Sequence, residues 1–155
     1  MKRVVVILLL SLVASAGAAR ADDGSTKSKK EIEPILAKMA VAANAHDTDG
    51  FLEPFLHDSS LTFVINGMVI HGWKALHEQQ LEWWKHGKSD AVYTQVGPTQ
   101  FQRISKDVEV TTRSLTSRRT GPDGKIQTGK FAVTEIWRKL PQGWRIVYAH
   151  ESWQR

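Results

Sequence analysis

Three side chains near the C-terminal end, Glu135, Tyr148 and His150, are of types that carry out acid–base chemistry. A carboxylate or an imidazole removes or supplies a proton, and a phenol donates a hydrogen bond to a developing oxyanion. Such groups act together only if the fold brings them close to one another. The elements that carry them therefore decide whether they form a site.

Two turn sequences define the strands that carry these residues. Gly121-Pro-Asp-Gly124 and Leu140-Pro-Gln-Gly143 contain the residues that tight turns select. Long stretches rich in β-branched and aromatic residues flank both turns, as expected of strands. The sequence thus predicts a meander of antiparallel strands over residues 91–104, 108–119, 125–140 and 144–153.

The two turns also predict which side chains share a face of the sheet. We expect Leu140 to lie opposite Gly143, and Thr120 to lie opposite Lys125. Because side chains alternate between faces with a period of two, these pairings place one set together. The set is largely apolar with a polar strip through it: Val108, Val110, Thr112, Ser114, Phe131, Val133, Glu135, Trp137, Trp144, Ile146, Tyr148, His150 and Ser152.

This predicted face has two interpretations. Under covering helices Glu135 needs a partner, because an isolated buried carboxylate is costly. In the predicted register Tyr148 lies directly opposite Glu135, and His150 is a diagonal neighbour. Together with Thr112 and Ser152, these groups form either a satisfied internal polar network or the polar wall of a ligand cavity. Both interpretations depend on the register, since a slip of one residue moves every side chain to the other face.

The first half of the chain predicts the helices that cover the sheet. Apolar residues at helical spacing predict a helix over residues 31–45 and a short one that begins at Asp47 or Thr48. Asn66-Gly67 predicts a hairpin, and a third, amphipathic helix follows over residues 73–85. Helices followed by a strand meander predict the α+β class, with three N-terminal helices packed on one face of a curved antiparallel sheet.

The sequence is compatible with more than one role for each of four tryptophans. Trp73 and Trp84, on the predicted third helix, either line the cavity or pack on the sheet. Trp83 and Trp153 are not both buried by these same faces, and we expect one of them to mark a subunit contact.

The N-terminus carries the pattern of a secretory signal peptide. A basic start at Lys2 and Arg3 precedes an apolar run, and small residues end in Ala19-Arg-Ala21. We expect cleavage after Ala21, export to the bacterial periplasm, a flexible leader over residues 22–30, and a single domain over residues 31–155. Cleavage removes three of the 21 basic residues and no acid, so the net charge falls from +5 to +2. The basic excess therefore gives no reason to expect a nucleic-acid partner or stable membrane insertion.

The sequence gives little support for a cysteine-based, metal or phosphate-binding site. The chain has no cysteine, so a thiolate nucleophile and a cysteine zinc site are excluded. His77-Glu78 begins like a zinc-protease motif, but Leu81 stands where the second histidine ligand is required. No phosphate-binding glycine motif occurs either. We expect neither a metal nor a cofactor.

The C-terminal segments resemble a known family. Gly129-Lys-Phe-Ala-Val-Thr-Glu-Ile-Trp137 and Gly143-Trp-Arg-Ile-Val-Tyr-Ala-His-Glu-Ser152 resemble the signature of the SnoaL-like branch of the nuclear transport factor 2-like superfamily. The association domain of calcium/calmodulin-dependent protein kinase II is a relative with a similar pattern. The resemblance implies a conical cavity, with the residues matching Glu135, Tyr148 and His150 pointing into it. It also implies a homodimer that pairs through the convex face of the sheet.

Three function classes follow from these expectations. The first is an exported protein that binds a small hydrophobic or amphipathic molecule in a conical pocket, without an assigned reaction. The second is an acid–base enzyme of the isomerase, dehydratase or hydrolase type that uses Glu135, Tyr148 and His150. The third is a structural or interaction role through the outer face of the sheet.

Overall fold

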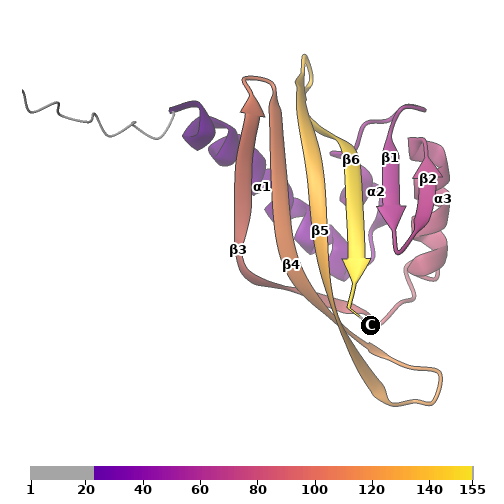
Figure 1. Ribbon diagram of the computed structural model, residues 1–155. Coiled ribbons are helices and arrows are strands. Elements are labelled where there is room, and N and C mark those ends of the chain that lie inside the picture. The colour runs from indigo at the N-terminus through magenta and orange to yellow at the C-terminus, as the bar shows by residue number, and fades with distance from the viewer. Residues whose placement is uncertain (1–22, 155) are drawn as a thin grey trace, which may run out of the picture.

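A single curved sheet of six strands organises the molecule, and the computed structural model describes residues 23–154 (Figure 1). The strand order across the sheet is β2–β1–β6–β5–β4–β3. The elements along the chain are α1 (Asp23–Ala45), α2 (Thr48–Leu52), β1 (Thr62–Ile65), β2 (Met68–His71), α3 (Trp73–Trp83), β3 (Val92–Ser105), β4 (Val108–Thr120), β5 (Ile126–Leu140) and β6 (Gly143–Trp153). The predicted α+β class is confirmed.

The strand pairings follow from the turns and from one long connection. β1 and β2 form the hairpin expected from Asn66-Gly67, whose φ angles of 47° and 89° are those a two-residue hairpin turn requires. β3 to β6 form an antiparallel meander. β1 pairs with β6 in parallel, and this pairing joins the hairpin to the meander.

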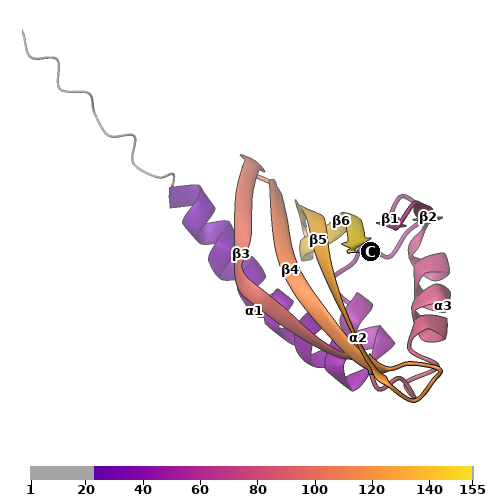
Figure 2. The same cartoon turned by 60° about the horizontal axis from the view of Figure 1, so that its bottom comes forward.

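The helices gather on the concave side of the curved sheet (Figure 2). α1 runs across the strands, and α3 lies beside the β1–β2 hairpin. Between helices and sheet lies an apolar core built from both, with Trp137 and Ile146 fully buried at its centre. Burial of apolar surface of this kind is the main favourable contribution to folding.

Helix α1 begins earlier than the sequence predicts. We expected a flexible leader over residues 22–30, but residues 23–30 are helical and continue into the predicted helix. Tertiary contacts account for the difference: the buried Ser28 hydroxyl donates to the Glu109 carboxylate at 2.6 Å, and Lys29 lies over the Phe101 ring. Because the helix begins at Asp23, Pro34 lies inside it and not in its first turn. Because the segment is polar in composition, its packing against the sheet could not be recognised from the sequence.

The predicted register between β5 and β6 is wrong beyond Trp137. Leu140 lies opposite Gly143 and Trp137 opposite Ile146, as expected, but Ile136 then pairs with Tyr148. Val147 is therefore the extra residue of a β-bulge, and every residue after it in β6 changes face. Tyr148, His150 and Ser152 move away from the helices.

The predicted register between β4 and β5 is also wrong by one residue. Thr120 pairs with Ile126 rather than with Lys125, because the loop holds five residues closed by a bond from the Gly121 amide to the Lys125 carbonyl. The inward side chains of β4 are consequently Glu109, Thr111, Arg113, Leu115 and Ser117. The predicted set Val108, Val110, Thr112 and Ser114 belongs to the opposite face.

The predicted signal peptide and its cleavage after Ala21 lie outside the described residues. Within residues 23–154, no helix is both long enough and apolar enough to cross a membrane.

Candidate functional site

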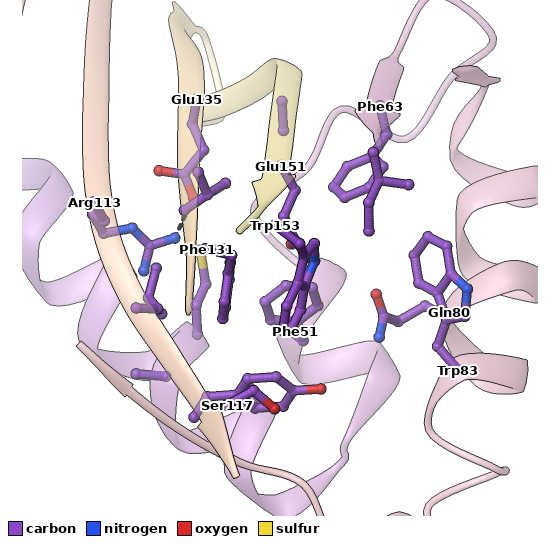
Figure 3. A pocket seen from close by; sticks show the side chains of 18 of the residues that line it. Phe51, Phe63, Gln80, Trp83, Arg113, Ser117, Phe131, Glu135, Glu151 and Trp153 are labelled. Carbon is purple, nitrogen blue, oxygen red and sulfur yellow. Dashed lines mark hydrogen bonds and ion pairs between the residues drawn. The ribbon is translucent and has the colours of Figure 1, made fainter. Parts of the chain in front are cut away.

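A cavity of about 480 Å³ lies between the concave face of the sheet and the helices (Figure 3). Its charged groups come from β4, β5 and β6, where Arg113, Glu135 and Glu151 project from neighbouring strands. α3 contributes Gln80 and Trp83 from the opposite side. Cavities of this size, mostly apolar with a few polar groups, are typical of small-molecule sites.

Glu135 is held in a closed network. Its exposure is 1% and that of Arg113 is 7%, and the Arg113 guanidinium forms an ion pair with carboxylate oxygen Oε1. The Thr111 hydroxyl donates to the other oxygen at 2.6 Å, and the indole nitrogen of Trp137 donates to Thr111 at 2.9 Å. Both oxygens of Glu135 thus have partners. Of the two interpretations of this residue, the geometry favours the satisfied internal network.

Glu151 is the less satisfied carboxyl of the cavity. The indole nitrogen of Trp153 donates to its Oε1 at 2.5 Å, while its Oε2 has no hydrogen bond from the described residues. Burial raises the pKa of Glu151 from an ordinary 4.5 to about 7; Glu135 also raises it, whereas the hydrogen bond from Trp153 and the charge of Arg113 act in the opposite direction. Glu151 therefore exchanges a proton near neutral pH.

The β1–β2 turn positions this end of β6. The Asn66 side-chain oxygen accepts a hydrogen bond from the Trp153 backbone amide at 3.0 Å. The backbone amide of Asn66 donates to the Glu151 carbonyl at 3.3 Å. The Trp153 ring stacks on Phe131 of β5, with ring centroids 4.3 Å apart. A side chain at Gly129 would collide with the Trp153 ring, because an added Cβ would come within 2.8 Å of it. These contacts fix the indole that donates to Glu151.

Tyr93 and the end of α1 close another part of the cavity wall. The indole nitrogen of Trp84 donates to the Tyr93 hydroxyl at 3.0 Å, and burial raises the pKa of that phenol. The Asn44 side chain pairs with the backbone of Tyr93 through two hydrogen bonds, of 2.7 Å and 3.0 Å. Gln80 is buried at the cavity wall, and Figure 3 shows its amide on the α3 side.

The structure separates the residues that the sequence grouped together. Glu135 faces the cavity, but Tyr148, His150, Thr112 and Ser152 lie on the opposite face of the sheet, for the register reasons given above. His150 and Ser152 are exposed there, and Thr112 lies 3.4 Å from the Thr134 hydroxyl. The triad of Glu135, Tyr148 and His150 is therefore not a site.

The tryptophans divide in a way the sequence did not predict. Trp84 lines the cavity, whereas Trp73 lies between the rings of His57 and His77 outside it. Trp83 and Trp153 both line the cavity and are both half-buried.

Sequence reasoning missed Arg113, Glu151 and Tyr93 as cavity residues. One signal for Glu151 is visible in β6. Its apolar residues occupy even positions in the first half of the strand (Trp144 and Ile146) and odd positions in the second half (Ala149 and Trp153). A change of parity within one strand is what a bulge produces. For Arg113 and Tyr93 we find no comparable signal.

The chemistry available here is that of one ionisable carboxyl in an aromatic cavity. Within residues 23–154 no group of three histidine or acidic side chains could hold a metal ion. Arg113 and Glu135 form an ion pair with each other. Glu151 is therefore the cavity carboxyl that can offer a proton or a charge to a bound molecule.

Comparisons with known proteins identify the fold. No protein-family model matches the sequence, and no curated protein matches it. A nuclear transport factor 2-like superfamily protein from Salmonella enterica serovar Typhimurium superposes with a TM-score of 0.71 at 20% identity, covering 82% of this chain and 91% of that one. The association domain of calcium/calmodulin-dependent protein kinase II from C. elegans gives a TM-score of 0.65 at 18% identity, covering 84% and 99%.

A third structure, from Streptomyces avermitilis, belongs to the nuclear transport factor 2-like family and is named as a proposed dehydratase. Its TM-score is 0.69 at 12% identity, and the match covers 83% of this chain and 97% of that one. The protein thus has the nuclear transport factor 2-like fold, as the resemblance of its C-terminal segments predicted. At these identities the likeness shows the fold and leaves the function to the site.

Proposed function

We propose that this protein binds a small amphipathic molecule in the cavity between sheet and helices. The observation that carries the proposal is the cavity itself: about 480 Å³, with aromatic walls and a half-buried carboxyl, Glu151, that has a free oxygen. The apolar body of a ligand would pack against the rings, and its polar end would meet Glu151 or the Gln80 amide.

Binding can be measured with a neutral fluorescent probe. We expect N-phenyl-1-naphthylamine to bind the purified protein and to change the emission of Trp83, Trp84 and Trp153, which line the cavity. Ala40→Trp, which places a large ring at the cavity wall on α1, should weaken binding at least about tenfold by steric exclusion. The matched control is Ala37→Trp, one turn earlier on the same helix and also exposed, which should bind like the unmodified protein.

Native mass spectrometry of the purified protein provides a second readout, because a bound molecule adds its mass to the folded chain. If the probe and a panel of hydrophobic metabolites all fail to bind, and no small molecule co-purifies, the binding function is wrong. The interaction role through the outer face of the sheet would then be the better proposal.

A second candidate function, acid–base catalysis, is favoured by one observation. The Glu151 carboxyl, with its pKa raised to about 7 by burial, can both donate and accept a proton at neutral pH. It would replace the predicted triad, since Tyr148 and His150 lie on the other face. The fold neighbour from Streptomyces avermitilis that is named as a proposed dehydratase is in line with this candidate.

The catalytic candidate predicts that the protein changes a metabolite. When the protein is incubated with a small-molecule extract, at least one compound should be consumed, as measured by mass spectrometry. Glu151→Gln should slow this change about a hundredfold or more, because it removes the proton-transferring group. Glu78→Gln, an exposed carboxyl on α3 outside the cavity, should leave the rate unchanged. An extract that stays the same over long incubation excludes catalysis and leaves binding intact.

We also propose export and self-association. Export rests on the pattern of residues 1–21, with cleavage after Ala21 and a periplasmic destination. A homodimer that pairs through the face of the sheet opposite the cavity is in line with the association domain among the fold neighbours.

A further inference from the structure

The aromatic rings that line the cavity influence which ligand charge it favours. Eight of the side chains that line it are aromatic, from Phe51 on the helix side to Trp153 on the sheet. The face of an aromatic ring carries partial negative charge and attracts cations, most strongly for tryptophan. Three of the eight rings belong to tryptophans: Trp83, Trp84 and Trp153.

Among the charged groups of the cavity, one carboxyl has no cation in contact with it. The lining includes two arginines and two glutamates, and neither lysine nor histidine. Arg113 is neutralised by Glu135, and Arg119 is exposed near the end of β4. Glu151 remains as a half-buried carboxyl whose contact partner, the Trp153 indole, is neutral. The charge of Arg113 acts on Glu151 only from a distance, so an ionised Glu151 would leave a negative charge inside the cavity without a cation in contact with it.

We infer that the ligand is an organic cation, a protonated amine or quaternary ammonium with an apolar body, whose charged head lies beside Glu151 among the aromatic rings. This inference rests on the proposed binding function and names its ligand class. A cation would supply the partner that an ionised Glu151 lacks, and the rings would replace part of its lost hydration.

An anionic ligand fits these residues less well. It would lie beside Glu151 and would have to compete with Glu135 for the Arg113 guanidinium. The Nε of Arg113 has no acceptor among the described residues, but it is covered by protein atoms, so a ligand does not reach it without a movement of the side chain.

The inference predicts proton-linked binding, and the groups around Glu151 are few. They are Arg113 and Arg119 of β4, Glu135 of β5 and Tyr93 of β3, while the helices place no ionisable side chain at the cavity wall. Burial raises the pKa of Tyr93 further above its ordinary 10, so this phenol keeps its proton between pH 6 and 8. Arginine stays charged throughout this range. A pH dependence between these values thus reports on the carboxyls.

The test uses three probes of nearly the same shape: benzyltrimethylammonium, its uncharged carbon isostere neopentylbenzene, and benzylsulfonate. Each is titrated against bound N-phenyl-1-naphthylamine at pH 6, 7 and 8. We expect the cation to compete best. Its affinity should rise about tenfold from pH 6 to pH 8, because a carboxyl with a pKa of about 7 goes from about one-tenth to about nine-tenths ionised. The ammonium itself does not titrate.

Two variants identify the group responsible. Glu151→Gln keeps the shape of the side chain and its hydrogen bond from Trp153, but it should remove the pH dependence and weaken cation binding at pH 8 about tenfold. Glu78→Gln, the exposed control, should keep both. If neopentylbenzene or benzylsulfonate competes better than the cation, or if cation binding does not vary with pH, the inference is wrong while the binding function stands. If none of the three compounds competes, the inference is wrong while the binding function stands. If N-phenyl-1-naphthylamine and the metabolite panel also fail to bind and no small molecule co-purifies, both are wrong.

Discussion

Replacement of Arg113 by methionine is expected to lower the free energy of unfolding by about 3–5 kcal/mol, because it leaves the Glu135 carboxylate buried without its counter-ion. Methionine keeps much of the volume of the arginine stem, so lost packing contributes little. Thr111 still donates to Glu135, but one neutral hydrogen bond does not replace a guanidinium. Urea denaturation at pH 7, followed by tryptophan fluorescence, measures the change.

Two further variants separate the charge effect from general sensitivity of β4. Arg119→Met replaces an exposed arginine of the same strand and should change the stability by no more than about 0.5 kcal/mol. The double variant Arg113→Met with Glu135→Gln removes both charges and should be more stable than Arg113→Met alone. Equal losses for Arg113→Met and Arg119→Met would contradict the prediction, since the buried pair would then contribute no more than an exposed arginine.

Replacement of Glu151 by glutamine is expected to stabilise the protein by up to about 3 kcal/mol at pH 8 and by no more than about 1 kcal/mol at pH 5. The sign follows from the pKa, which is about 7 in the folded chain and 4.5 ordinarily. Well below pH 4.5 both states hold the proton. Between pH 4.5 and 7 the folded state keeps a proton that the unfolded state has lost, so stability falls as pH rises. Above pH 7 the penalty is complete.

The measurement is the difference in unfolding free energy between Glu151→Gln and the unmodified protein from pH 5 to pH 8. Groups common to both chains cancel in this difference. Glu78→Gln, on the exposed side of α3, should show a flat difference close to zero. A stabilisation by Glu151→Gln that is constant across this range would mean that Glu151 does not titrate there.

The contrast between Glu135 and Glu151 bears on function. Both are carboxyls on neighbouring strands that face the same cavity, yet Glu135 has a cationic partner and a hydroxyl donor, while Glu151 has a single indole donor. The first arrangement is that of a structural ion pair. The second leaves a group that responds to a ligand or to pH, which is why the binding proposal depends on Glu151.

Much of the fold could be predicted from local signals. Asn66-Gly67 and Leu140-Pro-Gln-Gly143 predicted two hairpins that the structure contains, and apolar spacing placed the helices and strands to within a few residues except at the start of α1. Glu135 was recognised as an inward carboxyl because the last hairpin has the expected closure. These features depend on residues close together in the chain.

The composition of the site could not be predicted in the same way. A loop of five residues instead of four turned Arg113 inward in place of Thr112, and one bulge at Val147 turned Glu151 inward in place of His150. Each change shifts the register by a single residue, which costs little locally but reverses every later side chain.

By itself, then, the sequence determined the α+β class, the positions of two turns and the presence of an inward acidic residue on β5. Turn types and apolar periodicity are local properties, and they suffice for this. Only the tertiary structure decided which face each remaining side chain takes, because that choice depends on the packing of β4, β5 and β6 against the helices as a whole. The cavity carboxyl with its aromatic surroundings is a product of that packing.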